Sequence, residues 1–163
     1  MNNKHNTKSL SDYPSEAILQ ALEDLEWVEK TPGYKVDMDN WMVKTEDQCR
    51  VCQAGAVAMR RHPDTLSPLR RPSGCAFTRF GIIIKHPDEI LLKRQIQAFD
   101  DLREGRLHDF LHFWIGDMDY FRLANWCEGI QNSLGEWVTY EESPAVYKKN
   151  LRKISKWLDE AGY

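Results

Sequence analysis

Apolar residues recur along most of the chain at the spacing of an α-helix. In residues 14–30, Ile18, Leu22, Leu25 and Val28 lie three or four positions apart, which predicts a helix with one buried face. Similar stripes, bounded by proline, serine or glycine, predict further helices along the chain. These are expected over residues 46–61, from Pro87 to a stop at Gly105, over 106–115, from a cap at Asp117 or Asp119 to about Leu134, and from Ser143-Pro144 to Gly162.

Alternating positions predict a smaller amount of β-structure. YKVDMDNWMV, residues 34–43, alternates on both sides of Asp39-Asn40 and predicts a β-hairpin. FTRFGIII, residues 77–84, predicts a short strand, and the proline-rich residues 63–76 predict an irregular loop. The expected fold is mainly α, at the margin of α+β, with five or six helices and a small hairpin or short strands.

Composition limits the organisation of this fold. A chain of 163 residues, 42% of them hydrophobic, favours one domain with a real core, expected over residues 13–163 after a disordered lead-in at 1–12. The formal net charge of −3 gives no general attraction to nucleic acid. No apolar run is long enough to span a membrane, and the polar N-terminus has no secretory core. We therefore expect a cytoplasmic protein without membrane contacts, whose four cysteines are thiols or metal ligands.

The stretch CRVCQAGAVAMRRH, residues 49–62, admits two interpretations. Cys49 and Cys52 could bind zinc together with His108 and His112, which share a helix face. Against zinc, the cysteine pair lies in a helical pattern and is far from the histidines along the chain. A tightly packed helix is favoured instead, because free cysteine packs as a small hydrophobe and Gly55 would permit close approach of another helix or an aromatic ring. No cofactor is predicted.

Three short blocks also resemble one group of proteins. CRVCQAGAVAM, AFDDLREGRLHDFL and WLDEAGY are similar to segments of small uncharacterised bacteriophage and prophage proteins. The resemblance covers about a third of the chain and implies a phage-encoded accessory protein of the host cytoplasm. It carries no catalytic residue.

The basic stretch RRHPDTLSPLRR, residues 60–71, is the predicted binding element. Its four arginines, Arg60, Arg61, Arg70 and Arg71, lie on a proline-stiffened loop that could grip an acidic partner or phosphate. Trp41 is expected to be exposed and to add an aromatic contact. A competing interpretation pairs the arginines with the acidic helix 14–30.

Catalytic signatures are weak in this sequence. It has no glycine-framed serine nucleophile and no phosphate-binding loop. Asp37 with Asp39, and Asp117 with Asp119, could hold a hard metal ion but are more typical of turns and caps. Asp100 and Asp101 are expected on a solvent face, and the loop thiol Cys75 has no oriented base.

We therefore expect a non-enzymatic phage-type protein that binds a host protein or a small anionic ligand, for counter-defence or host takeover. A metal-assisted hydrolase or nuclease and a nucleic-acid-binding regulator are the alternatives. Homo-oligomerisation through aromatic side chains stays open.

Overall fold

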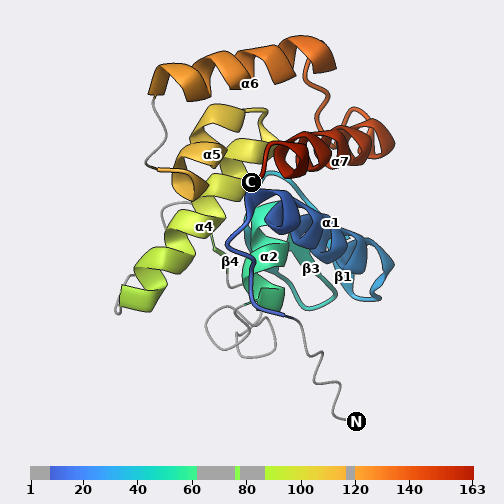
Figure 1. The fold of residues 1–163 in the computed structure, drawn as a ribbon. Coiled ribbons are helices and arrows are strands. Elements are labelled where there is room, and N and C mark those ends of the chain that lie inside the picture. Colours follow the sequence, from blue (N-terminus) through green and yellow to red (C-terminus); the bar gives the residue numbers. More distant parts are fainter. Residues whose placement is uncertain (1–7, 62–75, 78–86, 117–119) are drawn as a thin grey trace.

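The computed structural model describes residues 8–61, 76–77, 87–116 and 120–163. Its helices are α1 (Pro14–Lys30), α2 (Gln53–Arg61), α4 (Pro87–Arg103), α5 (Leu107–Trp114), α6 (Tyr120–Leu134) and α7 (Pro144–Glu160). Its strands are β1 (Tyr34–Val36), β2 (Met42–Lys44), β3 (Cys49–Val51) and β4 (Ala76–Phe77). The predicted mainly α fold with short strands is confirmed (Figure 1).

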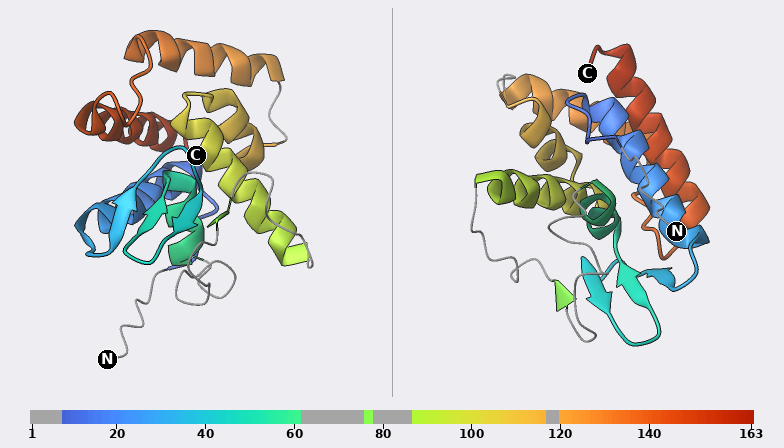
Figure 2. Two further views of the ribbon diagram at one scale, coloured as in Figure 1. Left: turned by 180° about the vertical axis from the view of Figure 1, so that it is seen from behind. Right: turned by 90° about the horizontal axis from the view of Figure 1, so that it is seen from below.

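Helices α1 and α7 lie side by side although they are far apart in the chain (Figure 2). The predicted stripe of α1 is buried, and α7 packs Leu151 and Ile154 into the same core. Helix α7 begins as predicted: the Ser143 side chain accepts a hydrogen bond from the Val146 N–H at 3.3 Å, and Pro144 occupies the first turn.

The strands form one small sheet with the order β1-β3-β2-β4. Strand β3 pairs with β1 in parallel and with β2 antiparallel. The predicted hairpin of residues 34–43 is therefore wrong: β1 and β2 both form, but β3 lies between them. Of the strand predicted at 77–84, only Phe77 is described, at the end of β4.

Helix α2 begins at Gln53, so the prediction that it starts near Glu46 is wrong. Residues 49–51 instead alternate between buried and half-buried positions, as a strand requires. The expected close neighbour of Gly55 exists, but it is backbone: an added Cβ would lie 1.6 Å from the carbonyl oxygen of Trp41. A glycine at this position lets α2 rest directly on the chain before β2.

Helices α4 and α5 follow each other around Gly105, which ends α4 as predicted. Gly105 has a φ of +80°, and a Cβ there would lie 2.7 Å from the Trp137 ring. The predicted apolar stripe of α4 is buried at Ile96, Phe99 and Leu102. The turn at Gly105 thus separates α4 from α5.

Helix α6 lies across α5 at the end of the molecule opposite the strands (Figure 1). It buries Leu123, Cys127 and Ile130 along one face. Its predicted caps, Asp117 and Asp119, lie outside the described residues. Among the described helices, none has both the length and the apolar character needed to cross a membrane.

The expected lead-in at residues 1–12 is described only from residue 8. The backbone N–H of Ser11 donates to Gln20 Oε1 at 2.8 Å, and Gln20 Nε2 donates to the Ser9 carbonyl at 3.0 Å. This segment therefore runs along α1.

Candidate binding surface

Arg60 and Arg61 lie in the last turn of α2 and bind Asp24 of α1. Arg60 donates to Asp24 Oδ1 at 2.8 Å, while Arg61 donates to both carboxylate oxygens at 2.9 Å. The Arg60 and Arg61 side chains are only 11% and 2% exposed. They join α1 to α2, and their predicted role in binding a partner stays a prediction. Arg70 and Arg71 lie outside the described residues.

Asp24 is the centre of this group, which we name the Asp24 ion cluster: Glu23, Asp24, Arg60 and Arg61. Burial raises the pKa of the Asp24 carboxyl from 3.8 to about 6, although both arginines act to lower it. Arg61 also donates to the backbone carbonyls of Lys8 and Gln20, at 2.8 and 3.3 Å. The cluster thus ties the first described residues and α1 to the end of α2.

Trp41, the aromatic residue expected on the surface, is only 4% exposed. That expectation is wrong because α2 packs against the Trp41 backbone at Gly55. Trp41 belongs to the core that α1, α2 and the sheet share.

The four candidate zinc ligands do not assemble into one site. Cys49 is in β3, Cys52 directly precedes α2, and His108 and His112 are on α5. Within the described ranges, no group of three or more His, Cys, Asp or Glu side chains is arranged to hold a metal ion.

The cysteines are instead buried thiols. Burial raises the pKa of Cys49 to about 11, of Cys52 to about 12 and of Cys127 to about 11. A thiol of this kind is a poor nucleophile at neutral pH, because the thiolate is the reactive form. Cys75 lies outside the described residues.

The carboxylate pair Asp37 and Asp39 forms a turn. Asp37 Oδ1 accepts a hydrogen bond from the Asp39 N–H at 3.0 Å, and its other oxygen lies 3.3 Å from Arg50 Nη1. The Asp37 carboxylate is therefore already bound to groups of the protein.

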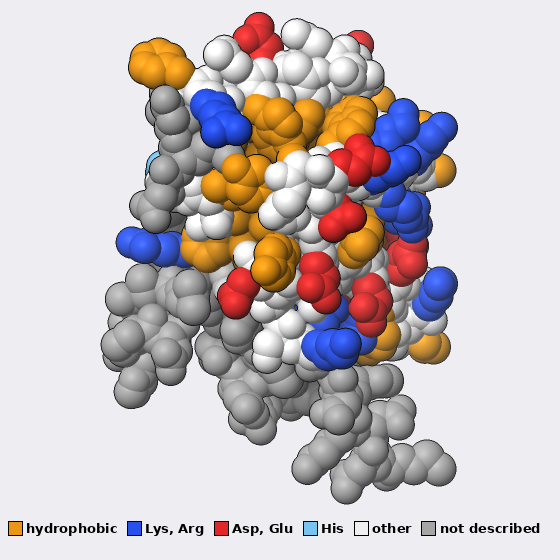
Figure 3. All heavy atoms as spheres, in the orientation of Figure 1, with side chains coloured by type: hydrophobic (Ala, Val, Ile, Leu, Met, Phe, Trp, Pro, Cys, Tyr) orange, Lys and Arg blue, Asp and Glu red, His pale blue; other side chains and the backbone are white. Residues whose placement is uncertain are grey.

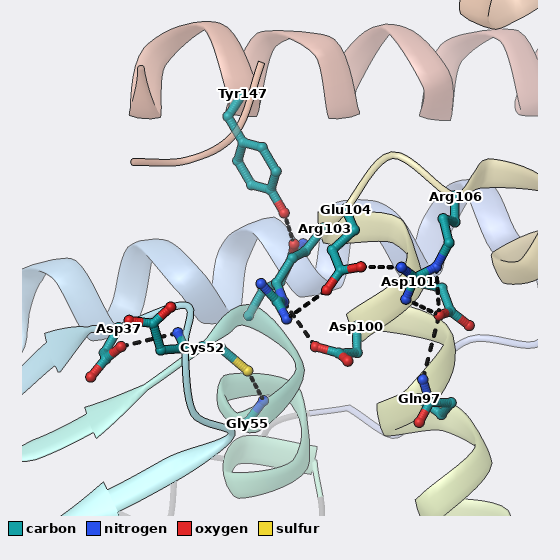
Figure 4. Close-up of polar contacts among 12 residues, drawn as sticks. Asp37, Cys52, Gly55, Gln97, Asp100, Asp101, Arg103, Glu104, Arg106 and Tyr147 are labelled. Atoms are coloured by element: carbon teal, nitrogen blue, oxygen red, sulfur yellow. Dashed lines mark hydrogen bonds and ion pairs between the residues drawn. The ribbon is translucent and has the colours of Figure 1, made fainter. Parts of the chain in front are cut away.

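A buried polar cluster, which the sequence did not predict, lies where α2, α4 and α7 meet. We name it by its residues: Cys52, Gln53, Asp100, Arg103 and Tyr147. The Tyr147 hydroxyl donates to Gln53 Oε1, and Arg103 Nε donates to Asp100 Oδ1 at 2.8 Å (Figure 4). The Gly55 N–H donates to Cys52 Sγ at 3.3 Å, so the thiol caps α2.

This cluster corrects the placement of Asp100, which is 3% exposed and not on a solvent face. Burial raises the pKa of the Tyr147 hydroxyl well above its usual value, so Tyr147 is a hydrogen-bond donor. The i,i+3 spacing of Asp100 and Arg103 could have indicated their ion pair. The described contacts make this cluster a polar joint between helices.

An open depression of about 450 Å³ lies between α4 and α5. It is lined by Arg94, Gln97, Ala98, Asp101, Asp109, His112 and Phe113. Asp101 is bound by Arg106 at 2.6 Å and by Gln97 at 3.4 Å. Arg94 and His112 are exposed, so they can donate hydrogen bonds to an incoming group.

Exposed or half-buried aromatic side chains are also present on α5, on α6 and at Tyr163. We name them the α5–α6 aromatic surface: Phe113, Trp114, Phe121, Trp126 and Tyr163. Phe121 is 76% exposed, and the other four are half-buried against the core. Hydrophobic side chains gather beneath α6 in the space-filling view (Figure 3). Such a surface is typical of a protein interface.

Comparison with known proteins found no matching family, no matching curated protein and no matching solved structure. The functional interpretation therefore depends on the residues of this chain.

Proposed function

We propose that this protein is a non-enzymatic, phage-type accessory protein that binds a host protein. The observation that carries the proposal is that Phe113 lines the α4–α5 depression and lies edge-on to Trp114, with 5.1 Å between the two ring centres. Aromatic residues at the centre and polar groups at the rim are the usual anatomy of a protein interface. The phage origin is supported by the three sequence blocks described above.

A protein partner suits this surface better than a small anion. The depression is open and its lining mixes the cation Arg94 with the carboxylates Asp101 and Asp109. A small anion would meet repulsion from the exposed Asp109 carboxylate, whereas a protein can place groups of both signs.

The chemistry of the described residues disfavours the enzymatic alternative. The cysteine thiols are buried, and Asp37 binds Arg50 and the Asp39 N–H. A hydrolase would need such groups to face a substrate. A nucleic-acid-binding role would depend on Arg70 and Arg71, and it is tested by their reversal to glutamate.

The proposal is tested by capture from a bacterial lysate with three single variants. Phe121→Ser and Arg94→Glu alter the proposed surface, while Leu19→Ser alters an exposed apolar side chain of α1, 49% exposed, as the matched control. We expect a captured protein to be lost with the first two variants and retained with the third. Capture that survives both variants, or that is lost equally with Leu19→Ser, would refute the proposed surface.

A further inference from the structure

Helices α1 and α7 run antiparallel and together present a surface that faces away from the core. Near the end of α1, a Glu29 carboxylate oxygen lies 2.9 Å from the Lys148 ammonium at the start of α7. Near the start of α1, the Ser15 carbonyl accepts a hydrogen bond from the Ser155 hydroxyl at 2.8 Å. Each helix buries its inner side, so its outer side is left exposed.

The outer side of α1 is acidic. Leu19, Glu23 and Glu26 follow one another at intervals of four and three residues, so they share one face of the helix. Leu19 and Glu23 are exposed, and Glu26 is half-buried beside α7. A negatively charged row with one apolar side chain therefore runs along this side of α1.

The outer side of α7 is basic. Four exposed residues, spaced by three or four positions, share this side: Val146, Lys149, Lys153 and Lys156. Within the described part of the chain, neither Lys149 nor Lys153 forms an ion pair. Residues 144–157 contain no Asp or Glu, so α7 itself offers these cations no counter-charge along that stretch. We name the acidic and the basic row together the α1–α7 outer face.

The two rows match each other across a twofold axis. An axis parallel to the helices, midway between two facing copies, places α1 of each copy over α7 of the other and keeps every residue at its own level. Glu26 is level with Arg152, since their side chains are 2.6 Å apart. Glu23 is then level with the turn of α7 that carries Lys153 and Lys156. Each acidic row thus meets a basic row, twice in the pair of molecules.

We propose that the α1–α7 outer face binds a second copy of this chain and forms a twofold dimer. Complementary charges determine the partner and its orientation more than the affinity. Apolar contact comes from Leu19, Val146 and the methylene stems of the lysines. A nucleic acid fits this face less well, because phosphates bound to α7 would lie beside the acidic row of α1. The dimer does not depend on the proposed function.

The size of the face predicts how strong this dimer is. Each helix has 17 residues and is about 25 Å long, and two helices side by side are about 20 Å wide. The face thus covers about 500 Å² per copy, or about 1,000 Å² in total, near the lower limit of specific interfaces. At one end, Glu16 of one copy comes near Glu160 of the other, and like charges weaken the contact. We therefore expect a weak dimer whose population depends on concentration.

The dimer is tested by analytical ultracentrifugation of the untagged full chain at low salt, at protein concentrations up to about 0.2 mM. Two charge-reversal variants are compared with wild type: Lys149→Glu/Lys153→Glu on α7 and Glu23→Lys/Glu26→Lys on α1. Lys35→Glu reverses an exposed lysine of β1 and is the matched control. Circular dichroism verifies that each variant is folded. Glu26→Lys alone replaces the α1 variant if that variant is unfolded, because Glu23 also lies 3.6 Å from Arg61.

We expect wild type and Lys35→Glu to dimerise, and the dimer to weaken as salt rises. Each reversal variant alone should dimerise at least about tenfold more weakly, because like charges then face each other at both contacts. An equimolar mixture of the α7 and α1 variants should dimerise again, since opposite charges then meet at both contacts. The inference is overturned if wild type stays monomeric at the highest concentration, if the α7 variant dimerises as wild type does, or if the mixture stays monomeric.

Discussion

Replacing Gly55 with alanine has two opposing effects on the stability of the fold, and their sizes can be compared. In a helix interior, alanine is favoured over glycine by about 1 kcal/mol. At Gly55, however, the new Cβ would lie 1.6 Å from the Trp41 carbonyl oxygen, where real Cβ contacts are essentially never closer than 3.0 Å. Helix α2 or the Trp41 backbone must therefore move by about 1.4 Å, the difference between these two distances.

The displacement should outweigh the gain in helix propensity. Overpacking a core typically costs about 1–3 kcal/mol, and a clash between two backbones belongs at the upper end because neither can rotate away. We expect Gly55→Ala to lower the free energy of unfolding by about 2 kcal/mol. For a chain of this size, the melting temperature should fall by about 4–8 °C.

Gly129→Ala is the matched control, since Gly129 is inside α6 and its added Cβ would meet nothing within 4 Å. This variant should keep most of the propensity gain, and its melting temperature should rise by about 2–4 °C. Thermal unfolding followed by circular dichroism, with urea titration for the free energies, measures both. If Gly55→Ala proves as stable as Gly129→Ala, α2 does not lie as close to the Trp41 backbone as described above.

Three further predictions concern buried polar groups. The folded protein raises the pKa of Asp24 from 3.8 to about 6, so the stability that protonated Asp24 contributes is present below pH 3.8 and is lost as the pH rises to about 6. In urea titrations over this pH range, wild type should therefore lose more unfolding free energy than Asp24→Asn does. An equal dependence of the unfolding free energy on pH in the two proteins would contradict the raised pKa. Tyr147→Phe should lower the free energy of unfolding by about 1–3 kcal/mol, because the buried Gln53 Oε1 loses its hydrogen-bond donor. The loss should exceed that of Tyr140→Phe, since the Tyr140 hydroxyl donates to Glu29 at the surface, and equal unfolding free energies for the two variants would refute this. In a Cys75→Ala variant, the buried thiols of Cys49, Cys52 and Cys127 should react with a thiol reagent only after denaturant is added, and fast labelling of the native protein would show that they are accessible.

The helical part of the fold was predictable because its signals are local. Ser143-Pro144 marked the start of α7, and Gly105 marked the end of α4. The stripe of α1 identified its buried face before any partner was known. Each of these features depends on neighbours within a turn or two of the same helix.

The sheet was harder to predict because strand partners are chosen at a distance. Residues 34–43 read as a hairpin, yet β3 separates its two strands. Residues 49–51 fit a helical pattern equally well, and only their pairing with β1 and β2 makes them a strand. Short apolar runs leave this ambiguity between strand and helix.

The candidate surface was the hardest part to predict from the sequence, because its residues come together only in the three-dimensional fold. Arginine at 60 and 61 indicated a binding loop, but the burial of Asp24 beside them could not be read from spacing. Both arginines form ion pairs with Asp24 of α1, which is the arrangement that the competing interpretation, pairing with the acidic first helix, describes. The depression lies between α4 and α5, and the turn that joins these helices depends on the positive φ of Gly105.

The pairing of α1 with α7 has a consequence for synthesis of the chain. The apolar face of α1 packs on a helix that begins at Pro144, more than a hundred residues after α1 ends. At bacterial or eukaryotic translation rates, that interval lasts on the order of 10 s. During it, the part of the α1 surface that α7 covers in the folded protein has no partner, so α1 must wait for the end of the domain before its packing is complete.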